Sequence, residues 1–310
     1  MLAAACGNVI HTWEPDFGIL YNFSQPDYYR YLGEGWARKN NIHSVAWMQR
    51  NSSILAMGTT EGNVEIWDYD ANKKLHVMNG HASRVSSLAW NSYILTSGSR
   101  LGKIIHHDVR KQYPILISTN AHSQEVCNLK WSPDEWYLAS GGNDNMLQIW
   151  LPITGRNHQP IYSFNQHQDA VKALAWCPWQ SNILASGGST YNRTIRFWNV
   201  NSGACLDKIE TKSQVCTLLW STNYKEIISG HGCKQNQLTI WKYPTMRKVA
   251  NLIGHTNHVS HLAMFPDETM MFSASTDKTM RLWNCFELDP QRMKKSNIKP
   301  IASILEESIR

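Results

Sequence analysis

The chain has 310 residues, of which 42% are hydrophobic and 17% charged, and its formal net charge is +6. This composition excludes a disordered chain, which would be poorer in apolar and richer in charged residues. Seven cysteines without a CxxC pair predict neither a disulfide framework nor a metal site. No apolar run approaches the roughly 18 residues of a membrane-spanning helix. The basic residues form no block of the kind that binds nucleic acid, so we expect neither membrane nor nucleic acid as a partner.

The first forty residues contain three short apolar stretches that predict strands: LAAAC (2–6), VIHTW (9–13) and ILYNF (19–23). From residue 42 onward the chain repeats itself. An apolar strand ends in Trp47, Trp90, Trp131, Trp176 and Trp220, and then in Phe265, at steps of 43, 41, 45, 44 and 45 residues. Such a period predicts a repeat architecture rather than several unrelated domains.

Each repeat continues in the same way. A second apolar strand ends in small residues, as in YLASGGN (137–143), and a third ends in Trp or a substitute, as in IRFWN (195–199). A short fourth strand such as CLDKIE (205–210) follows, and a histidine precedes most units. Four strands, a leading His and a trailing aromatic are the WD40 pattern, in which four-stranded blades stack radially because one blade cannot bury both of its faces. The histidines that lead the units are therefore predicted to be structural: His81, His122, His167 and His255.

The six units and the first forty residues together predict an all-β, seven-bladed WD40 β-propeller at 1–289, with incomplete first and last blades. A basic, flexible tail is expected at 290–310. Two missing strands would leave unpaired sheet edges, which promote aggregation, so we expect the chain to be part of a longer protein. The alternative is that IKPIASIL (298–305) folds back as the last strand.

Several stretches strongly resemble the Fizzy family of WD-repeat activators of the anaphase-promoting complex, a ubiquitin ligase. They are HSQEVCNLKWSPDEWYLASGGNDN (122–145), HQDAVKALAWCPWQSNILASGG (167–188), IRFWNVNSGACL (195–206), ISGHGCKQNQLTIWKYPTM (228–246) and LWNCFELDP (282–290). The resemblance covers residues 42–290 and more loosely the first forty. The match is divergent, and the subtype stays open, with a cortex-type meiotic member as one option.

The resemblance implies a non-enzymatic adaptor that carries degron-bearing substrates such as cyclins to the ligase in mitosis or meiosis, in the cytoplasm and nucleus. It implies no cofactor and no catalytic residue, and the chain contains no P-loop, nucleophile elbow or HExxH motif. The resemblance also implies spindle-checkpoint proteins as partners.

The family recognises the KEN degron on the top of the propeller. The matching positions are Asn143, Thr190 and Gln214, and a family arginine is replaced by His258. Amide and hydroxyl groups can satisfy a glutamate or an asparagine without burying charge. We therefore expect a KEN surface that is partly kept and altered at His258.

The destruction-box groove of the family maps onto Trp13 and Leu20, which match the leucine pocket, and onto Asp277 and Lys278 in the last repeat. The family usually has an acidic residue where Lys278 stands. A lysine there would repel a degron arginine by about 1 kcal/mol at a surface site. Poor recognition of standard destruction boxes is the expected result.

The last two residues, Ile309 and Arg310, match the Ile-Arg tail with which the family docks on tetratricopeptide subunits of the ligase. A terminal carboxylate and a guanidinium offer charge-assisted contacts, and the isoleucine offers an apolar anchor. The C-box that drives activation in the family is missing from this sequence. The alternative function is therefore a WD40 scaffold or competitor that docks without activating or without recognising degrons.

Overall fold

The structure, a computed structural model, describes residues 2–6, 9–13, 41–51, 53–111, 113–152, 159–265 and 267–286. Every regular element in these ranges is a β-strand. None of the described residues belongs to a helix that is long and apolar enough to cross a membrane. The strands form antiparallel sheets in which each strand pairs with its neighbours in sequence.

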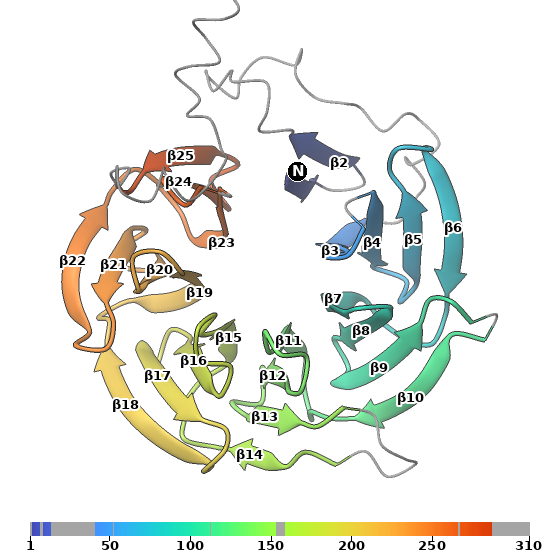
Figure 1. The fold of residues 1–310 in the computed structure, drawn as a ribbon, viewed down its shortest axis with the longest axis horizontal. Helices are drawn as coiled ribbons and strands as arrows, with labels where there is room; N and C mark the ends of the chain where they lie inside the picture. Colours follow the sequence, from blue (N-terminus) through green and yellow to red (C-terminus); the bar gives the residue numbers. More distant parts are fainter. Residues whose placement is uncertain are drawn as a thin grey trace, which may run out of the picture.

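Six sheets stand around a central opening as the blades of a propeller (Figure 1). The first three blades consist of β3 (Ile42–Trp47), β4 (Ile54–Thr59), β5 (Val64–Asp68) and β6 (Lys73–Met78); β7 (Val85–Asn91), β8 (Ile94–Ser99), β9 (Lys103–Asp108) and β10 (Ile115–Asn120); and β11 (Val126–Trp131), β12 (Leu138–Gly142), β13 (Leu147–Trp150) and β14 (Tyr162–Phe164). The other three consist of β15 (Val171–Trp176), β16 (Ile183–Gly188), β17 (Thr194–Asn199) and β18 (Ala204–Glu210); β19 (Gln214–Ser221), β20 (Glu226–Gly232), β21 (Leu238–Lys242) and β22 (Arg247–Leu252); and β23 (Val259–Met264), β24 (Met270–Ser275) and β25 (Met280–Asn284).

The remaining two strands, β1 (Leu2–Cys6) and β2 (Val9–Trp13), form a two-stranded hairpin. The hairpin lies in the arc of the ring between the β23–β25 blade and the β3–β6 blade, with β1 against β3 (Figure 1). The expectation of seven blades therefore needs correction: the described residues form six blades and this hairpin. Two five-residue strands cannot bury two faces as a blade does. The third predicted strand, at 19–23, lies outside the described residues.

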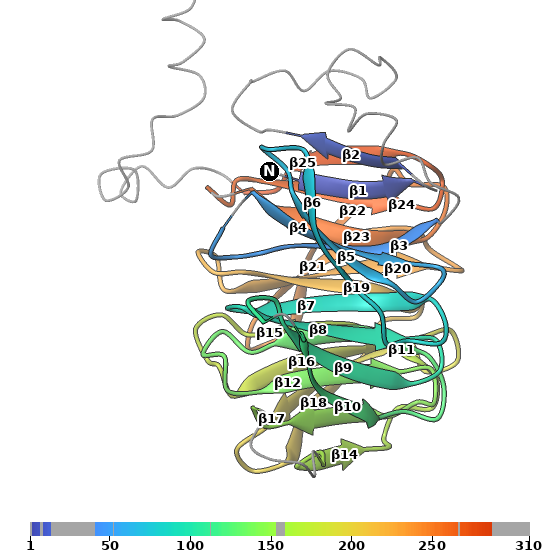
Figure 2. The same cartoon turned by 90° about the vertical axis from the view of Figure 1, so that its right-hand side faces the viewer.

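The last blade has three strands within the described residues, as expected for an incomplete blade, and β25 is its outer edge. The segment at 298–305 that was considered for a fourth strand lies outside them. The six repeat units otherwise match the six blades one to one, and Figure 2 shows from the side how the blades follow one another around the ring.

The first strand of every blade is the innermost one, next to the central opening (Figure 1). We call these six strands the inner strands: β3, β7, β11, β15, β19 and β23. We call the face of the ring at which they begin the top face. Because the strands of a blade alternate in direction, the loop between its second and third strands lies on this face too.

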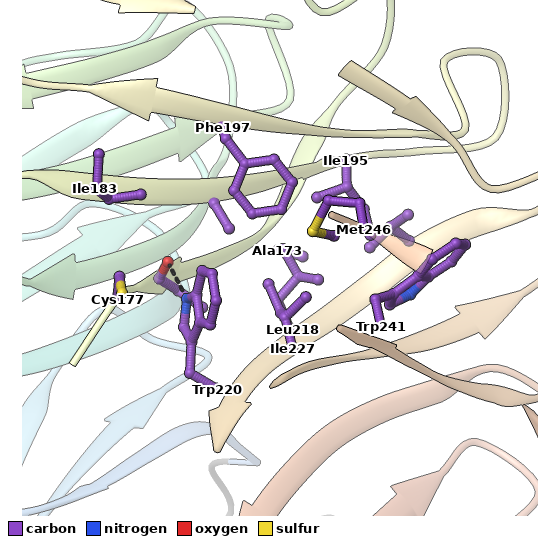
Figure 3. Packing of buried hydrophobic residues seen from close by; sticks show 13 residues of the cluster. Ala173, Cys177, Ile183, Ile195, Phe197, Leu218, Trp220, Ile227, Trp241 and Met246 are labelled. Carbon is purple, nitrogen blue, oxygen red and sulfur yellow. Dashed lines mark hydrogen bonds between the residues drawn. The ribbon is translucent and has the colours of Figure 1, made fainter. Parts of the chain in front are cut away.

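The cores lie between neighbouring blades and are rich in aromatic side chains. In the largest cluster, Trp220 of β19 packs with Phe197 of β17, Ile183 and Met246 (Figure 3). The indole Nε1 of Trp220 also donates a hydrogen bond of 3.1 Å to the carbonyl of Ala175 on the preceding inner strand. The tryptophans of the repeat thus fill the wedges between blades, and some of their indoles tie one inner strand to the next.

Candidate functional site

A serine on the second strand organises the interior of most blades. In the β11–β14 blade, Ser140 lies 2.8 Å from Nε2 of His122 and accepts a hydrogen bond of 2.9 Å from Nε1 of Trp150. The Nδ1 atom of His122 lies 2.9 Å from a carboxylate oxygen of Asp144 on the top face. This Asp–His–Ser–Trp chain joins the top-face loops to the blade interior.

The other leading histidines confirm their structural role, because each lies 2.7–2.8 Å from a serine hydroxyl within its own blade; the pairs are His81 with Ser97, His167 with Ser186, and His255 with Ser273. The adjacent His106 and His107 contact Thr96 and Ser97 separately. No group of three or more potential metal-ligating side chains occurs among the described residues.

All four residues predicted for the KEN surface lie on the top face, and three of them lie on consecutive blades around β19. Gln214, at the start of β19, is 4% exposed, and its Oε1 accepts a hydrogen bond of 3.1 Å from Thr190 in the loop before β17. The same oxygen accepts a hydrogen bond of 3.1 Å from the thiol of Cys233, which follows β20. Both lone pairs of this amide oxygen are then occupied, so the NH2 group is what Gln214 can offer to a ligand.

The third residue, His258, reaches the same blade from the other side. Its Nδ1 lies 4.0 Å from the sulfur of Cys216 on β19. A Cβ atom at Gly232 would lie 2.1 Å from this Nδ1, so a glycine is required at 232 for the histidine to fit. Burial raises the pKa of the Cys216 thiol to about 12, which keeps it protonated near neutral pH. We call Thr190, Gln214, Cys216, Cys233 and His258 the top-face cluster. It spans three consecutive blades.

Asn143 lies on the top face of the next blade along the ring, the β11–β14 blade. Its Nδ2 donates a hydrogen bond of 2.9 Å to Gln124, and its backbone N donates one of 2.8 Å to the carbonyl of Glu125. The carboxylate of Glu125 is held by the guanidinium of Arg84 at 2.8–3.0 Å. The structure thus places Asn143 on the same face as the top-face cluster but on a different blade, beside an ion pair.

The residues predicted for the destruction-box groove are only partly covered by the described residues. Asp277 lies in the loop between β24 and β25, where its carboxylate contacts His255 at 2.9 Å and accepts hydrogen bonds from the backbone N atoms of Thr256 and Thr279. Burial acts to raise the pKa of Asp277, but hydrogen bonds from Thr279, Thr256 and His255 outweigh it, and the pKa lies below its usual range. Asp277 therefore plays the same structural part as Asp144.

Lys278 follows in the same loop with a left-handed backbone, at φ +64°. Its side chain is exposed. Trp13 ends β2, where only the backbone is described, and Leu20 lies outside the described residues. The docking residues Ile309 and Arg310 also lie outside them, as does the tail at 290–310.

Sequence reasoning missed a cavity on the opposite face of the ring, between the β3–β6 and β7–β10 blades. Its volume is about 400 Å³, and its lining includes Leu75, Tyr93, Arg50 and Arg110. The guanidinium of Arg110 lies 4.8 Å from the centre of the Tyr93 ring and is also held by Asp108. The repeat pattern carries no signal for such a cavity, because the cavity depends on how the loops of two neighbouring blades meet.

Comparison with known proteins agrees with this architecture. The family model described as "CDC20/Fizzy WD40 domain" matches residues 1–283. The chain is 45% identical over 291 residues to "Anaphase-promoting complex subunit cdc20" of Dictyostelium discoideum, covering 93% of this chain and 56% of that protein. It is 42% identical over 306 residues to "Cell division cycle 20.1, cofactor of APC complex" of Arabidopsis thaliana, covering 97% of this chain and 65% of that protein. The chain thus spans less than two thirds of the length of these relatives.

A similar solved structure is a chain from the crystal structure of the mitotic checkpoint complex. The similarity has a TM-score of 0.84 and 38% sequence identity, and it covers 92% of this chain and 86% of that chain. The fold of nearly the whole chain is therefore shared with that protein.

Proposed function

The chain belongs to the CDC20/Fizzy WD40 domain family, and on that premise we propose that it is a substrate-recognition adaptor of the anaphase-promoting complex. In this role it binds degrons of cell-cycle proteins such as cyclins and presents them to the ligase, in the cytoplasm and nucleus of dividing cells. Relatives are named as a subunit or a cofactor of that complex, which supports the ligase as the partner. Neither of these relatives is named as an enzyme, and we infer that this chain has no catalytic activity of its own.

The observation that carries the proposal is the top-face cluster. Thr190, Gln214 and His258 come from three consecutive blades. The thiol of Cys233 bonds to Gln214 beside Thr190, and the thiol of Cys216 contacts His258, so that all five form a polar surface on the top face. A KEN peptide carries an ammonium group, a carboxylate and a carboxamide, and the last two need hydrogen-bond donors and acceptors rather than an apolar pocket. The NH2 group of Gln214, fixed by the two bonds to its oxygen, is suited to donate to the glutamate of the peptide. Asn143 extends this surface onto the next blade.

We assign the remaining contacts on the family resemblance. Trp13, Leu20 and Lys278 border the destruction-box groove, with Asp277 shaping the loop that carries Lys278. Ile309 and Arg310 dock on tetratricopeptide subunits. The propeller extends over 1–289 and the docking tail over 290–310. The hairpin β1–β2 occupies the place of a seventh blade in this arrangement. The similarity to a chain of the mitotic checkpoint complex supports checkpoint proteins as further partners.

A second function is favoured by one observation. Lys278 presents an exposed ammonium group on the loop where the family usually has an acidic residue. A chain that docks on the ligase but binds destruction boxes poorly would act as a competitor of a complete activator. The two functions predict opposite results for degron binding.

Fluorescence anisotropy with a labelled KEN peptide tests the proposal directly. We expect saturable binding to the full chain, reduced at least tenfold for a peptide in which alanine replaces the glutamate. Binding of both peptides with equal affinity would contradict the proposed adaptor function. Binding of neither would favour the competitor.

A further inference from the structure

Each inner strand departs from regular pairing at its second residue, or at its third in β19. The register shifts lie between Ile42 and Ser44, Val85 and Ser87, Val126 and Asn128, Val171 and Ala173, Val215 and Thr217, and Val259 and His261. Each shift is a β-bulge, which leaves one residue unpaired and re-aims its side chain. The bulged residues form a ring near the top of the central channel: His43, Ser86, Cys127, Lys172, Cys216 and Ser260.

The exposed side chains of the inner strands share one property. Four residues in these six strands are exposed, and all four are basic: His43, Lys130, Lys172 and His261. The six strands contain no Asp or Glu. Since the inner strands border the central opening (Figure 1), the water that reaches these side chains is the water of the channel.

Two of these exposed residues are also desolvated. Burial lowers the pKa of Lys130 on β11. Burial and, second, the charge of Lys130 lower the pKa of His261 on β23. Side chains that are exposed to water and yet desolvated lie in a narrow, protein-lined space rather than on an open surface. Lys130 and His261 therefore both lie in such a space, on inner strands that border the central opening.

Lys172 lies on the bulge ring between two thiols. Burial raises the pKa of Cys127 to about 12 and that of Cys216 also to about 12, and in both cases the charge of Lys172 acts in the opposite direction. These cysteines are the bulged residues of the inner strands on either side. The ammonium group of Lys172 thus acts on a neutral thiol on each side at the level of the ring.

Glu125 and Asp144, whose charges act on Cys127 of the ring, are already engaged. Glu125 is bound by Arg84 through three hydrogen bonds, and Asp144 is bound by His122. Neither Lys130 nor Lys172 takes part in an ion pair among the described residues. The channel therefore holds uncompensated positive charge where bulk water screens it poorly.

We propose that the central channel is an anion-binding site for a small molecule with linked phosphate groups, with Lys130 and Lys172 as its charged anchors and His261 as an additional hydrogen-bond donor. Three strand positions separate the levels of the two lysines, about 10 Å along a strand. Two ammonium groups at different levels of the channel are suited to a molecule with two or more linked phosphates, which can contact one group at each end. Lysine binds phosphate as a point charge and tolerates variable geometry. The site lies on strands, below the loops of the top-face cluster, and does not depend on the proposed degron function.

Isothermal titration calorimetry with pyrophosphate tests the site on the full chain. We expect binding that weakens about tenfold in Lys130→Met and about tenfold in Lys172→Met, because each substitution removes one charged contact. Lys248→Met is the matched control, since Lys248 is exposed on the outer strand β22. Sulfate, with its single anionic centre, is expected to bind more weakly than pyrophosphate. Equal affinities of the control and the two channel variants, or no binding to the unmodified chain, would overturn the proposal.

A second measurement needs no variant and so does not depend on folding. Lysines of the unmodified chain are acetylated with a small reagent, with and without pyrophosphate, and the sites are quantified by mass spectrometry. Pyrophosphate should protect Lys130 and Lys172 and leave Lys248 unchanged. Identical acetylation of Lys130 and Lys172 in both samples would place the anion elsewhere and overturn the assignment.

Discussion

Replacing Gln214 with alanine is expected to weaken KEN-peptide binding without unfolding the propeller. The side chain of Gln214 is buried, and its oxygen holds both Thr190 and Cys233 at 3.1 Å. Removing a hydrogen bond to a charged ligand group costs about 1.5–3 kcal/mol, which corresponds to a roughly 10- to 150-fold loss of affinity. Thr190 is half-buried and Cys233 is exposed, so water can replace their lost acceptor, and the cost in folding stability stays near 1 kcal/mol.

The assay is fluorescence anisotropy of a labelled KEN peptide, with circular dichroism melting of each variant. Gln235→Ala serves as the control, because Gln235 is exposed in the loop that follows Cys233 and contacts Gln237. The control should bind as the unmodified chain does. If Gln214→Ala also binds the peptide with unchanged affinity while melting normally, the top-face cluster is not the KEN site and the reasoning fails.

Three further predictions concern packing, charge and pH. Trp220→Ala removes the centre of the largest core and the hydrogen bond to Ala175. We expect the unfolding free energy to fall by about 3–5 kcal/mol in denaturant titrations. A loss below about 1 kcal/mol would refute the packing account. Lys278→Glu should raise the affinity of an arginine-bearing destruction-box peptide by about fivefold, because reversing this surface charge changes the binding free energy by about 1 kcal/mol. Unchanged binding in a competition assay would speak against this groove. Burial lowers the pKa of His81 to about 4 and of His107 to about 3, from 6.5. The unfolded chain therefore binds more protons than the folded one between pH 6.5 and 4, and the unfolding free energy should fall on acidification by about 1.4 kcal/mol per pH unit for each such histidine. Guanidinium titrations from pH 7.5 to 4.5 that show a constant value would contradict this.

The repeat pattern predicts the blades well because each blade is specified locally. A strand that ends in Trp131, a small-residue strand and a strand that ends in Trp150 recur in sequence order and pair in that order. The number of blades was predicted less well. Whether LAAAC and VIHTW become part of a blade depends on strands contributed from elsewhere in the chain, and the described residues contain a hairpin instead.

The candidate site could be predicted only in part, because its key contacts join different blades. The resemblance identified Thr190, Gln214 and His258, but nothing in the repeat marks Cys233 or Cys216 as the groups that link them. The bulges of the inner strands are equally hidden, since a bulge is defined by the register against the partner strand. The exposure of Lys130 and Lys172 in an otherwise buried set of strands therefore emerges only from the folded ring.

The central claim is that this chain works as an adaptor of the anaphase-promoting complex, and the most direct test is a tagged pull-down from dividing cells. The intact chain is compared with one that lacks Ile309 and Arg310, and ligase subunits are detected in each. We expect the subunits to co-purify with the intact chain and to be lost or strongly reduced without the last two residues. Failure of the intact chain to bring down any ligase subunit would contradict the account.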